Sequence, residues 1–113
     1  MTDKIVVLSA CGTEREAETI ARRLVEKRLA ACVNLIPHVH SVYRWKGRVE
    51  DAKETILVIK STRGLFAELT RELSAMHSYK VPEAIALPVV DGLEPYLDWI
   101  GRETGPERAD ESR

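Results

Sequence analysis

The chain has 113 residues, of which 44% are hydrophobic and 31% charged. This composition is typical of one globular domain with a modest core and excludes a fibrous, disordered or multidomain protein. Lysine and arginine (17) nearly balance aspartate and glutamate (18), so the net charge of -1 gives no field that would gather nucleic acid or an anionic membrane surface. The N-terminus runs directly into a strand-length apolar stretch without a signal-peptide pattern, and we expect a cytoplasmic protein.

A strand and a helix are predicted first along the chain. Ile5 to Ala10 is apolar and rich in β-branched residues, which predicts a strand buried on both faces. Thr13 and Glu16 have the spacing of a capping box, in which each side chain bonds an otherwise free backbone N–H, so a helix is expected from Thr13. Its apolar residues recur at helical spacing and indicate a helix that covers one face of a sheet. They are Ala17, Ile20, Ala21, Leu24 and Val25.

From Cys32 the apolar residues alternate with polar ones, which is the period of a strand. The alternating apolar side chains are Val33, Leu35, Val39, Tyr43 and Trp45. This pattern predicts a long strand, interrupted at Pro37, that turns at Lys46-Gly47 and returns through Thr55 to Ile59.

The last part of the chain predicts a second helix, a strand and a closing helix. Thr62 is expected to cap the second helix, and its buried stripe is Leu65, Phe66, Leu69 and Leu73. A loop over residues 76–81 leads to a strand from Ala84 to Val90 and a short helix from Leu93 to Ile100. Residues 1–101 then form a single domain, and the polar residues 102–113 are predicted to form a flexible tail.

The element order predicts an α+β fold, the ferredoxin-like βαββαβ sandwich with one additional short C-terminal helix. Two of its strands reach about 12 residues, against a usual 5 or 6. The exposed edge of such a hairpin, with Tyr43 and Trp45 near its tip, invites another chain to add to it. We therefore expect a closed homo-oligomer built by the hairpin that runs from Cys32 to Thr62.

Five sequence blocks, in this order, resemble successive signatures of the CutA family. The blocks are Leu29 to Asn34, Ser41 to Gly47, Ile59 to Thr62, His77 to Glu83 and Tyr96 to Ile100. The resemblance covers residues 4 to 100, and ordered blocks are more specific than one short motif. It implies a homotrimer with long intersubunit hairpins, and an association with copper and divalent-cation tolerance.

The resemblance also implies a copper site that this chain matches only in part. Copper-binding members use a Cys near the end of the first strand and paired histidines ahead of the last strand. Here Ser9 stands at the Cys position and Met76-His77 at the histidine pair, so only His77 carries over. Met76 is open to two interpretations, a thioether ligand for Cu(I) and a packing residue, and packing is the commoner role.

The topology adds a second candidate ligand. Cys11 ends the first strand and Cys32 begins the second, at opposite ends of the sheet, so we expect both to stay reduced and unpaired. Cys11 lies beside the N-terminus of the first helix, whose dipole favours a thiolate. The loop with His77, Tyr79 and Glu83 is expected beside it. His77 and Cys11 are thus the candidate ligands for copper or another divalent metal.

Structural roles are open for the same residues. His77 alternatively caps a helix, Tyr79 is a core aromatic with its hydroxyl tied to the backbone, and Glu83 pairs with Lys60 or an arginine. Tyr79, Glu83, Lys60 and Trp45 are the candidates for a ligand cleft between subunits, with Trp45 at a subunit contact as its sharper role.

Three classes of function compete. A metal-associated or small-ligand-binding homotrimer is favoured. Its expected partners are copies of the same chain and a metal ion, and it is expected to bind neither nucleic acid nor a membrane. A PII-like signalling or interaction trimer without a specific metal site is the alternative. An enzyme is not expected, because the acylphosphatases that share the strand order need a Gly-rich phosphate cradle, and Cys11-Gly12-Thr13 offers one glycine. His38 and His40 have an i, i+2 spacing that can chelate but is more often a solvated strand face.

Overall fold

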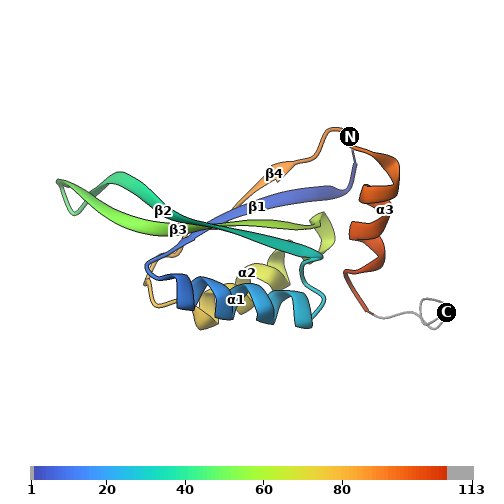
Figure 1. The fold of residues 1–113 in the computed structure, drawn as a ribbon, viewed down its shortest axis with the longest axis horizontal. Helices are drawn as coiled ribbons and strands as arrows, with labels where there is room; N and C mark the ends of the chain where they lie inside the picture. Colours follow the sequence, from blue (N-terminus) through green and yellow to red (C-terminus); the bar gives the residue numbers. More distant parts are fainter. Residues whose placement is uncertain (1, 107–113) are drawn as a thin grey trace.

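The structure is a computed structural model that describes residues 2–106. Four strands form one antiparallel sheet in the order β2-β3-β1-β4, with helices between them (Figure 1). The elements are β1 (Lys4–Cys11), α1 (Glu14–Glu26), β2 (Cys32–Trp45), β3 (Arg48–Thr62), the 3-10 helix η1 (Arg63–Leu65), α2 (Phe66–Met76), β4 (Ile85–Pro88) and α3 (Glu94–Arg102). This confirms the expected α+β, ferredoxin-like βαββαβ order with a closing helix. No helix among residues 2–106 has the length and hydrophobicity that a membrane crossing requires.

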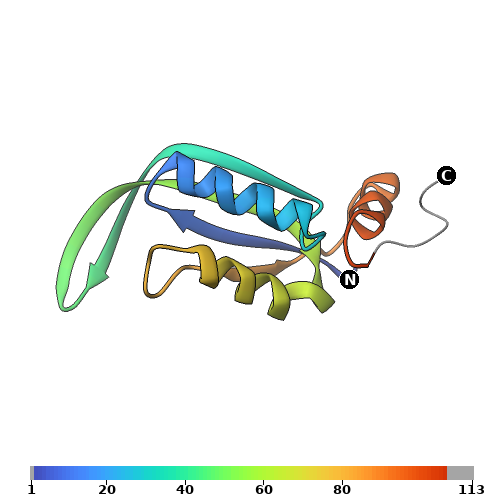
Figure 2. The ribbon, with the colours of Figure 1, turned by 90° about the horizontal axis from the view of Figure 1, so that it is seen from below.

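The core lies between the sheet and the helices α1 and α2. These two helices lie side by side beneath one face of the sheet (Figure 2). Alternate residues of β1 and β3 point into this layer, because side chains of a strand alternate between its faces. The fully buried members include Val7, Leu57 and Ile59 from the strands, Ile20 and Leu24 from α1, and Leu69 and Leu73 from α2.

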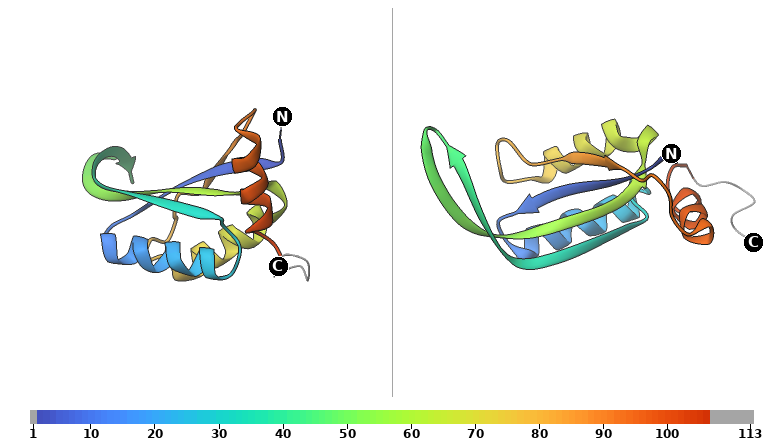
Figure 3. Two further views of the ribbon diagram at one scale, coloured as in Figure 1. Left: turned by 45° about the vertical axis from the view of Figure 1, so that its right-hand side comes forward. Right: turned by 90° about the horizontal axis from the view of Figure 1, so that it is seen from above.

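The opposite face of the sheet, which we call the open face, carries apolar side chains without a helix over its middle among the described residues (Figure 3). The register places these side chains directly across from one another on neighbouring strands. They are Val6, Leu8, Ile36, Ile56, Val58, Ile85 and Leu87. Ile36, Ile85 and Leu87 are about half exposed, so the apolar surface continues to both edge strands.

The ends of β2 and β3 extend beyond the rest of the sheet as a two-stranded arm. β1 ends where Cys11 pairs with Thr55, and the paired residues 39–54 beyond this point, here called the hairpin arm, pair with no other strand of the described chain (Figure 1). A bulge lies at the base of the arm, between Ile36 and Val39. β2 is therefore bent at Pro37 rather than interrupted there, because the strand pairing resumes after it.

Two of the expected helix caps differ from the structure. The Thr13 hydroxyl accepts the Glu16 N–H at 3.1 Å, as a capping residue should, but the Glu16 carboxylate does not return the bond and binds Ser78 instead. Thr62 precedes η1 in an extended conformation and its side chain makes no capping hydrogen bond. The expectation of a Thr62 cap was therefore wrong. A 3-10 turn intervenes before α2 begins at Phe66.

The C-terminal boundaries also shift. The strand expected from Ala84 to Val90 is limited to Ile85–Pro88, and the last helix extends to Arg102. Beyond it, the buried Thr104 donates to the Ile100 carbonyl at 2.8 Å, and Gly105 N–H donates to the Arg28 carbonyl at 2.8 Å. Residues 107–113 of the expected tail lie outside the described residues.

Candidate functional site

Three potential metal ligands converge where β1 ends and α2 finishes. One ligand atom each from Cys11, Glu16 and His77 lies within 4.8 Å of the other two. β1 supplies Cys11, the first turn of α1 supplies Glu16, and His77 follows the last residue of α2. The structure thus brings together both residues that the sequence predicted as metal ligands, and it adds a carboxylate.

Hydrogen bonds fix the ring of His77. Its Nε2 lies 2.8 Å from the Ala10 carbonyl and 3.6 Å from Cys11 Sγ, while Nδ1 accepts the Tyr79 backbone N–H at 3.0 Å. A carbonyl only accepts and an amide N–H only donates, so this pattern assigns the ring hydrogen to Nε2. His77 therefore joins the end of α2 to β1, in addition to facing the thiol.

Glu16 was predicted as a capping residue and not as part of a site. Its two carboxylate oxygens accept the Ser78 N–H at 2.7 Å and the Ser78 hydroxyl at 3.1 Å. The carboxylate thereby holds the loop after α2 against the start of α1. No signal in the sequence distinguishes this role, because the i, i+3 spacing from Thr13 already accounts for Glu16 in a helix start.

The state of the Cys11 thiol differs from the expectation. Cys11 is fully buried, and burial, together with the charges of Glu16 and Glu54, raises its pKa from 9.0 to about 12. The dipole of α1 was expected to favour a thiolate, and this was wrong, because desolvation and two carboxylates outweigh a partial charge at a helix end. A thiol in this position loses its proton only when a strongly bound metal cation takes the proton's place on the sulfur.

The second part of the site is a groove along the hairpin arm, between the arm and the loop after α2. It has a volume of about 510 Å³ and is lined by Tyr43, Trp45 and Glu54 of the hairpin and by Tyr79, Val81 and Glu83 of the loop after α2. We call it the arm groove. Three predicted cleft residues, Trp45, Tyr79 and Glu83, thus line one hollow.

Tyr79 is held in the groove through its hydroxyl. The hydroxyl donates to Glu54 at 2.8 Å, and burial, followed by this bond and the Glu54 charge, raises the pKa of Tyr79. A side chain on Gly12 would approach that hydroxyl within 3.3 Å, so a glycine here leaves room for the bond. Tyr79 is 37% exposed and bonds a side chain, which corrects the alternative of a core aromatic tied to the backbone. Glu54 had not been singled out in the sequence.

Lys60 lies elsewhere. It pairs in register with Cys32 and Val6, near the C-terminal end of β3. The arm groove lies toward the N-terminal end of the same strand, before Thr55. Its ammonium donates to the Asn34 side-chain oxygen and lies 4.0 Å from Cys32 Sγ. Lys60 therefore does not line the arm groove of its own chain, and no Glu83–Lys60 pair forms among residues 2–106.

The two histidines of β2 do not form a chelating pair. His38 occupies the bulge, with a φ of 63°, and its Nε2 lies 3.8 Å from Glu14 of α1. His40 lies 2.7 Å from Asp51 across the hairpin. The two rings thus contact different elements.

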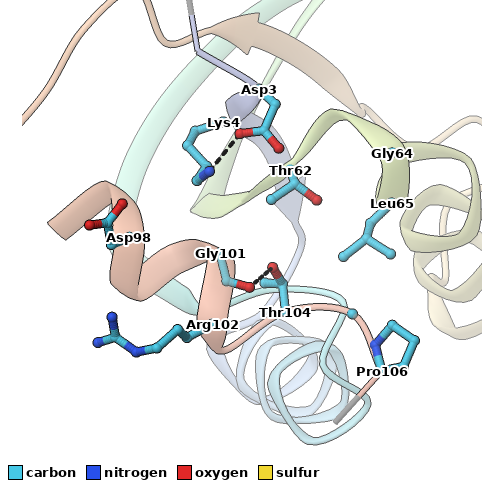
Figure 4. Close-up of a pocket in the computed structure, with 11 residues that line it drawn as sticks. Asp3, Lys4, Thr62, Gly64, Leu65, Asp98, Gly101, Arg102, Thr104 and Pro106 are labelled. Atoms are coloured by element: carbon cyan, nitrogen blue, oxygen red, sulfur yellow. Dashed lines mark hydrogen bonds and ion pairs between the residues drawn. The ribbon is translucent and has the colours of Figure 1, made fainter. Parts of the chain in front are cut away.

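A larger cavity of about 780 Å³ lies at the other end of the sheet, between η1 and α3 (Figure 4). Its charged side chains are Asp3, Lys4, Asp98 and Arg102. Lys4 is paired with Asp3 at 2.5 Å, and Asp98 and Arg102 project from α3 away from that pair (Figure 4). The charges are mixed and do not converge on one point, and no residue predicted for a site lines this cavity.

The Cys11 cluster has a donor set that fits a soft or borderline metal ion. Thiolate sulfur and imidazole nitrogen are ligands of copper and zinc, and a carboxylate oxygen completes a set that zinc accepts. All three groups make other hydrogen bonds or carry a proton in the structure, so binding would exchange these interactions for metal bonds.

Comparison with known proteins gives a consistent result. Residues 5–103 match the family described as CutA1 divalent ion tolerance protein. The divalent-cation tolerance protein CutA of Thermus thermophilus is 47% identical over 100 residues, which cover 88% of this chain and 97% of that protein. Protein CutA of Homo sapiens is 49% identical over 83% of this chain, which spans about half, 52%, of the human protein's length.

Solved structures agree with the sequence matches. The Thermus thermophilus divalent cation tolerance protein has a TM-score of 0.89 at 46% identity, over 90% of this chain and 99% of that one. CutA of Xylella fastidiosa has a TM-score of 0.89 at 41% identity, over 92% and 100% of the two chains. With a family match over most of its length and a shared fold at this identity, the chain belongs to the CutA1 divalent ion tolerance family.

Proposed function

We propose that this protein acts in divalent-cation tolerance as a cytoplasmic homotrimer that binds copper or another divalent metal at Cys11, Glu16 and His77, and that it is not an enzyme. The convergence of three ligand atoms within 4.8 Å carries the metal part of the proposal. The two cysteines are free, which is usual for a protein in a reducing compartment.

The open face supports the trimer. Its apolar side chains are partly exposed in the isolated chain, and exposed apolar surface of this extent is typical of an interface. The hairpin arm supports the same proposal, because a two-stranded ribbon alone is only marginally stable in water and gains stability when another chain covers it. A closed ring of three copies would cover both features.

Sedimentation tests the assembly. The protein is expected to sediment as a trimer at micromolar concentration, and Val58→Lys, which places a charge in the middle of the open face, should shift it to monomer. Val25→Lys is the matched control, since Val25 is 41% exposed on α1, which lies on the other side of the sheet from the open face (Figure 2). A parent protein that sediments as a monomer would contradict the assembly.

Calorimetric titration with Cu and Zn, combined with the metal content of the untagged protein, tests the site. His77→Ala and Cys11→Ser should each weaken binding, whereas a His38/His40 double substitution should leave it unchanged. The opposite pattern would show that metal binds along the exposed strand.

One observation favours the alternative of a PII-like signalling or interaction trimer without a metal site. Both ring nitrogens of His77 and both oxygens of Glu16 already have protein partners, as residues with a purely structural role do. A parent trimer that binds neither Cu nor Zn would support this alternative.

A further inference from the structure

The open face carries an unbalanced charge at each of its two ends. Lys60 lies near the C-terminal end of β3, and Glu54 lies where the hairpin arm begins. Side chains of a strand alternate between its faces, so both residues point to the open face, with the apolar Ile56 and Val58 between them. A strand rises about 3.3 Å per residue, which separates Lys60 from Glu54 by about 20 Å. The two side chains together cannot span this distance within one chain.

Lys60 has no counter-charge in its own chain. Its ammonium donates to the Asn34 side-chain oxygen and lies 4.0 Å from Cys32 Sγ, and it forms no salt bridge with a carboxylate among residues 2–106. The side chain is already half-buried on the open face. An assembly that covers this face would take the ammonium out of water, and an unpaired charge is costly to bury. Such an assembly therefore favours a contact that brings a carboxylate to Lys60.

The arm groove has groups that suit an ammonium. Glu54 and Glu83 line it, and neither forms a salt bridge among the described residues. Lys80 is the cationic side chain in the lining, so two carboxylates and one cation leave one negative charge without a partner. Aromatic rings also attract an ammonium group to their faces. The aromatic members of the lining are Tyr43, Trp45 and Tyr79.

We propose that the neighbouring subunit's Lys60 completes the arm groove in the homotrimer and pairs with Glu83. Glu83 is the partner because one oxygen of Glu54 already accepts the Tyr79 hydroxyl. The inference rests on the proposed assembly and goes beyond it by naming an ion pair that joins two subunits. Each end of one open face then meets the opposite end of the next, which is the head-to-tail contact that closes a ring. The Glu83–Lys60 pair predicted from the sequence thus forms between chains instead of within one.

An exchange of the two charges tests the pair. Lys60→Glu and Glu83→Lys each place like charges at the contact. Each should raise the protein concentration at which half of the trimer dissociates at least tenfold, because breaking a desolvated charge pair weakens association by more than this. The double variant Lys60→Glu/Glu83→Lys restores opposite charges in exchanged positions and should recover most of the loss. Sedimentation equilibrium of the full chain measures all four proteins.

Three features of the design separate a specific pair from a general effect of charge. Lys60→Arg keeps the positive charge and should assemble like the parent protein. Glu50 lies on the same face of the arm, opposite Tyr43, but does not line the groove, so Glu50→Lys should fail to rescue Lys60→Glu. Glu83 is exposed in a loop of the single chain, so Glu83→Lys leaves the fold intact and reports on the interface even where Lys60→Glu folds poorly.

The outcomes distinguish this inference from the proposed function. Recovery of the trimer in the Lys60→Glu/Glu83→Lys protein, without recovery in the Lys60→Glu/Glu50→Lys protein, would support the pair. A trimeric parent whose single variants assemble normally, or whose double variant assembles no better than they do, would overturn the pair and leave the proposed assembly intact. A parent protein that sediments as a monomer would refute the assembly and the ion pair with it.

Discussion

His77 and Tyr79 are joined in two ways: the Tyr79 backbone N–H donates to His77 Nδ1 at 3.0 Å, and the two ring centroids lie 4.8 Å apart. The other ring nitrogen of His77 holds the Ala10 carbonyl. The imidazole therefore connects the Cys11 cluster with the residue that forms one wall of the arm groove. A substitution at His77 therefore alters both the Cys11 cluster and the arm groove.

Replacement of His77 by Ala should lower the free energy of unfolding as well as metal affinity. The variant loses hydrogen bonds to Ala10 and Tyr79, and each such bond contributes about 1 kcal/mol, so a loss of roughly 1–2 kcal/mol is expected. Urea unfolding of the metal-free protein gives this value. A variant with unchanged stability would show that the ring does not connect α2 to β1 in solution.

The raised pKa of Cys11 predicts a fall in stability at alkaline pH. Between 9.0 and about 12 the unfolded chain loses the thiol proton while the folded chain retains it, so the unfolded state gains and stability decreases as pH rises through this window. Urea unfolding between pH 8 and pH 11, in metal-free buffer, should show a smaller decline for Cys11→Ala than for the parent protein. Cys32→Ala, which leaves the Cys11 thiol in place, should decline like the parent protein.

Much of the fold could be predicted, because it depends on local periodicity. The helical spacing from Ala17 to Leu24 and the capping Thr13 both hold in the structure. The bulge could not be predicted. Strict alternation places Val33, Leu35 and Tyr43 on one face, whereas the extra residue at the bulge leaves Val33 against the core and turns Tyr43 to the open face.

In the candidate site, only the residues at the ends of a strand or a helix could be predicted. Cys11 and His77 could be placed together because a strand end and a helix end meet at the same edge of the sheet. Glu16 and Glu54 were missed, since their roles depend on side-chain partners far away in the sequence: Ser78 for Glu16 and Tyr79 for Glu54. Lys60 lies apart from these residues because it stands near the C-terminal end of the 15-residue strand β3, opposite Val6.

The left-handed conformation of His38 predicts opposite effects of glycine at two neighbouring histidines. A φ of 63° is unfavourable for a residue with a Cβ and free of penalty for glycine, so His38→Gly should raise stability by about 0.5–1 kcal/mol. His40→Gly, in regular strand, should lower it by about the same amount. Thermal unfolding of the two variants provides the comparison, and a destabilised His38→Gly protein would contradict the bulge geometry.

Two buried serines on neighbouring strands should respond in opposite directions to the same substitution. Ser9 of β1 and Ser61 of β3 are both fully buried, and Ser61 donates to the Leu29 carbonyl at 2.6 Å. Among the described residues, Ser9 Oγ is the one buried side-chain polar atom without a hydrogen-bond partner.

Ser9→Ala removes a hydroxyl that lost its hydrogen bonds to water on folding and formed none in the protein. The substitution should therefore stabilise the protein by about 1 kcal/mol. Ser61→Ala leaves the Leu29 carbonyl without this donor and should destabilise by about 1–2 kcal/mol, because a buried acceptor then lacks a bond. Urea denaturation of both variants and the parent at one protein concentration gives the two values and keeps the contribution from assembly comparable. A Ser9→Ala protein less stable than its parent would mean that the hydroxyl has a partner in solution, such as an ordered water in the core.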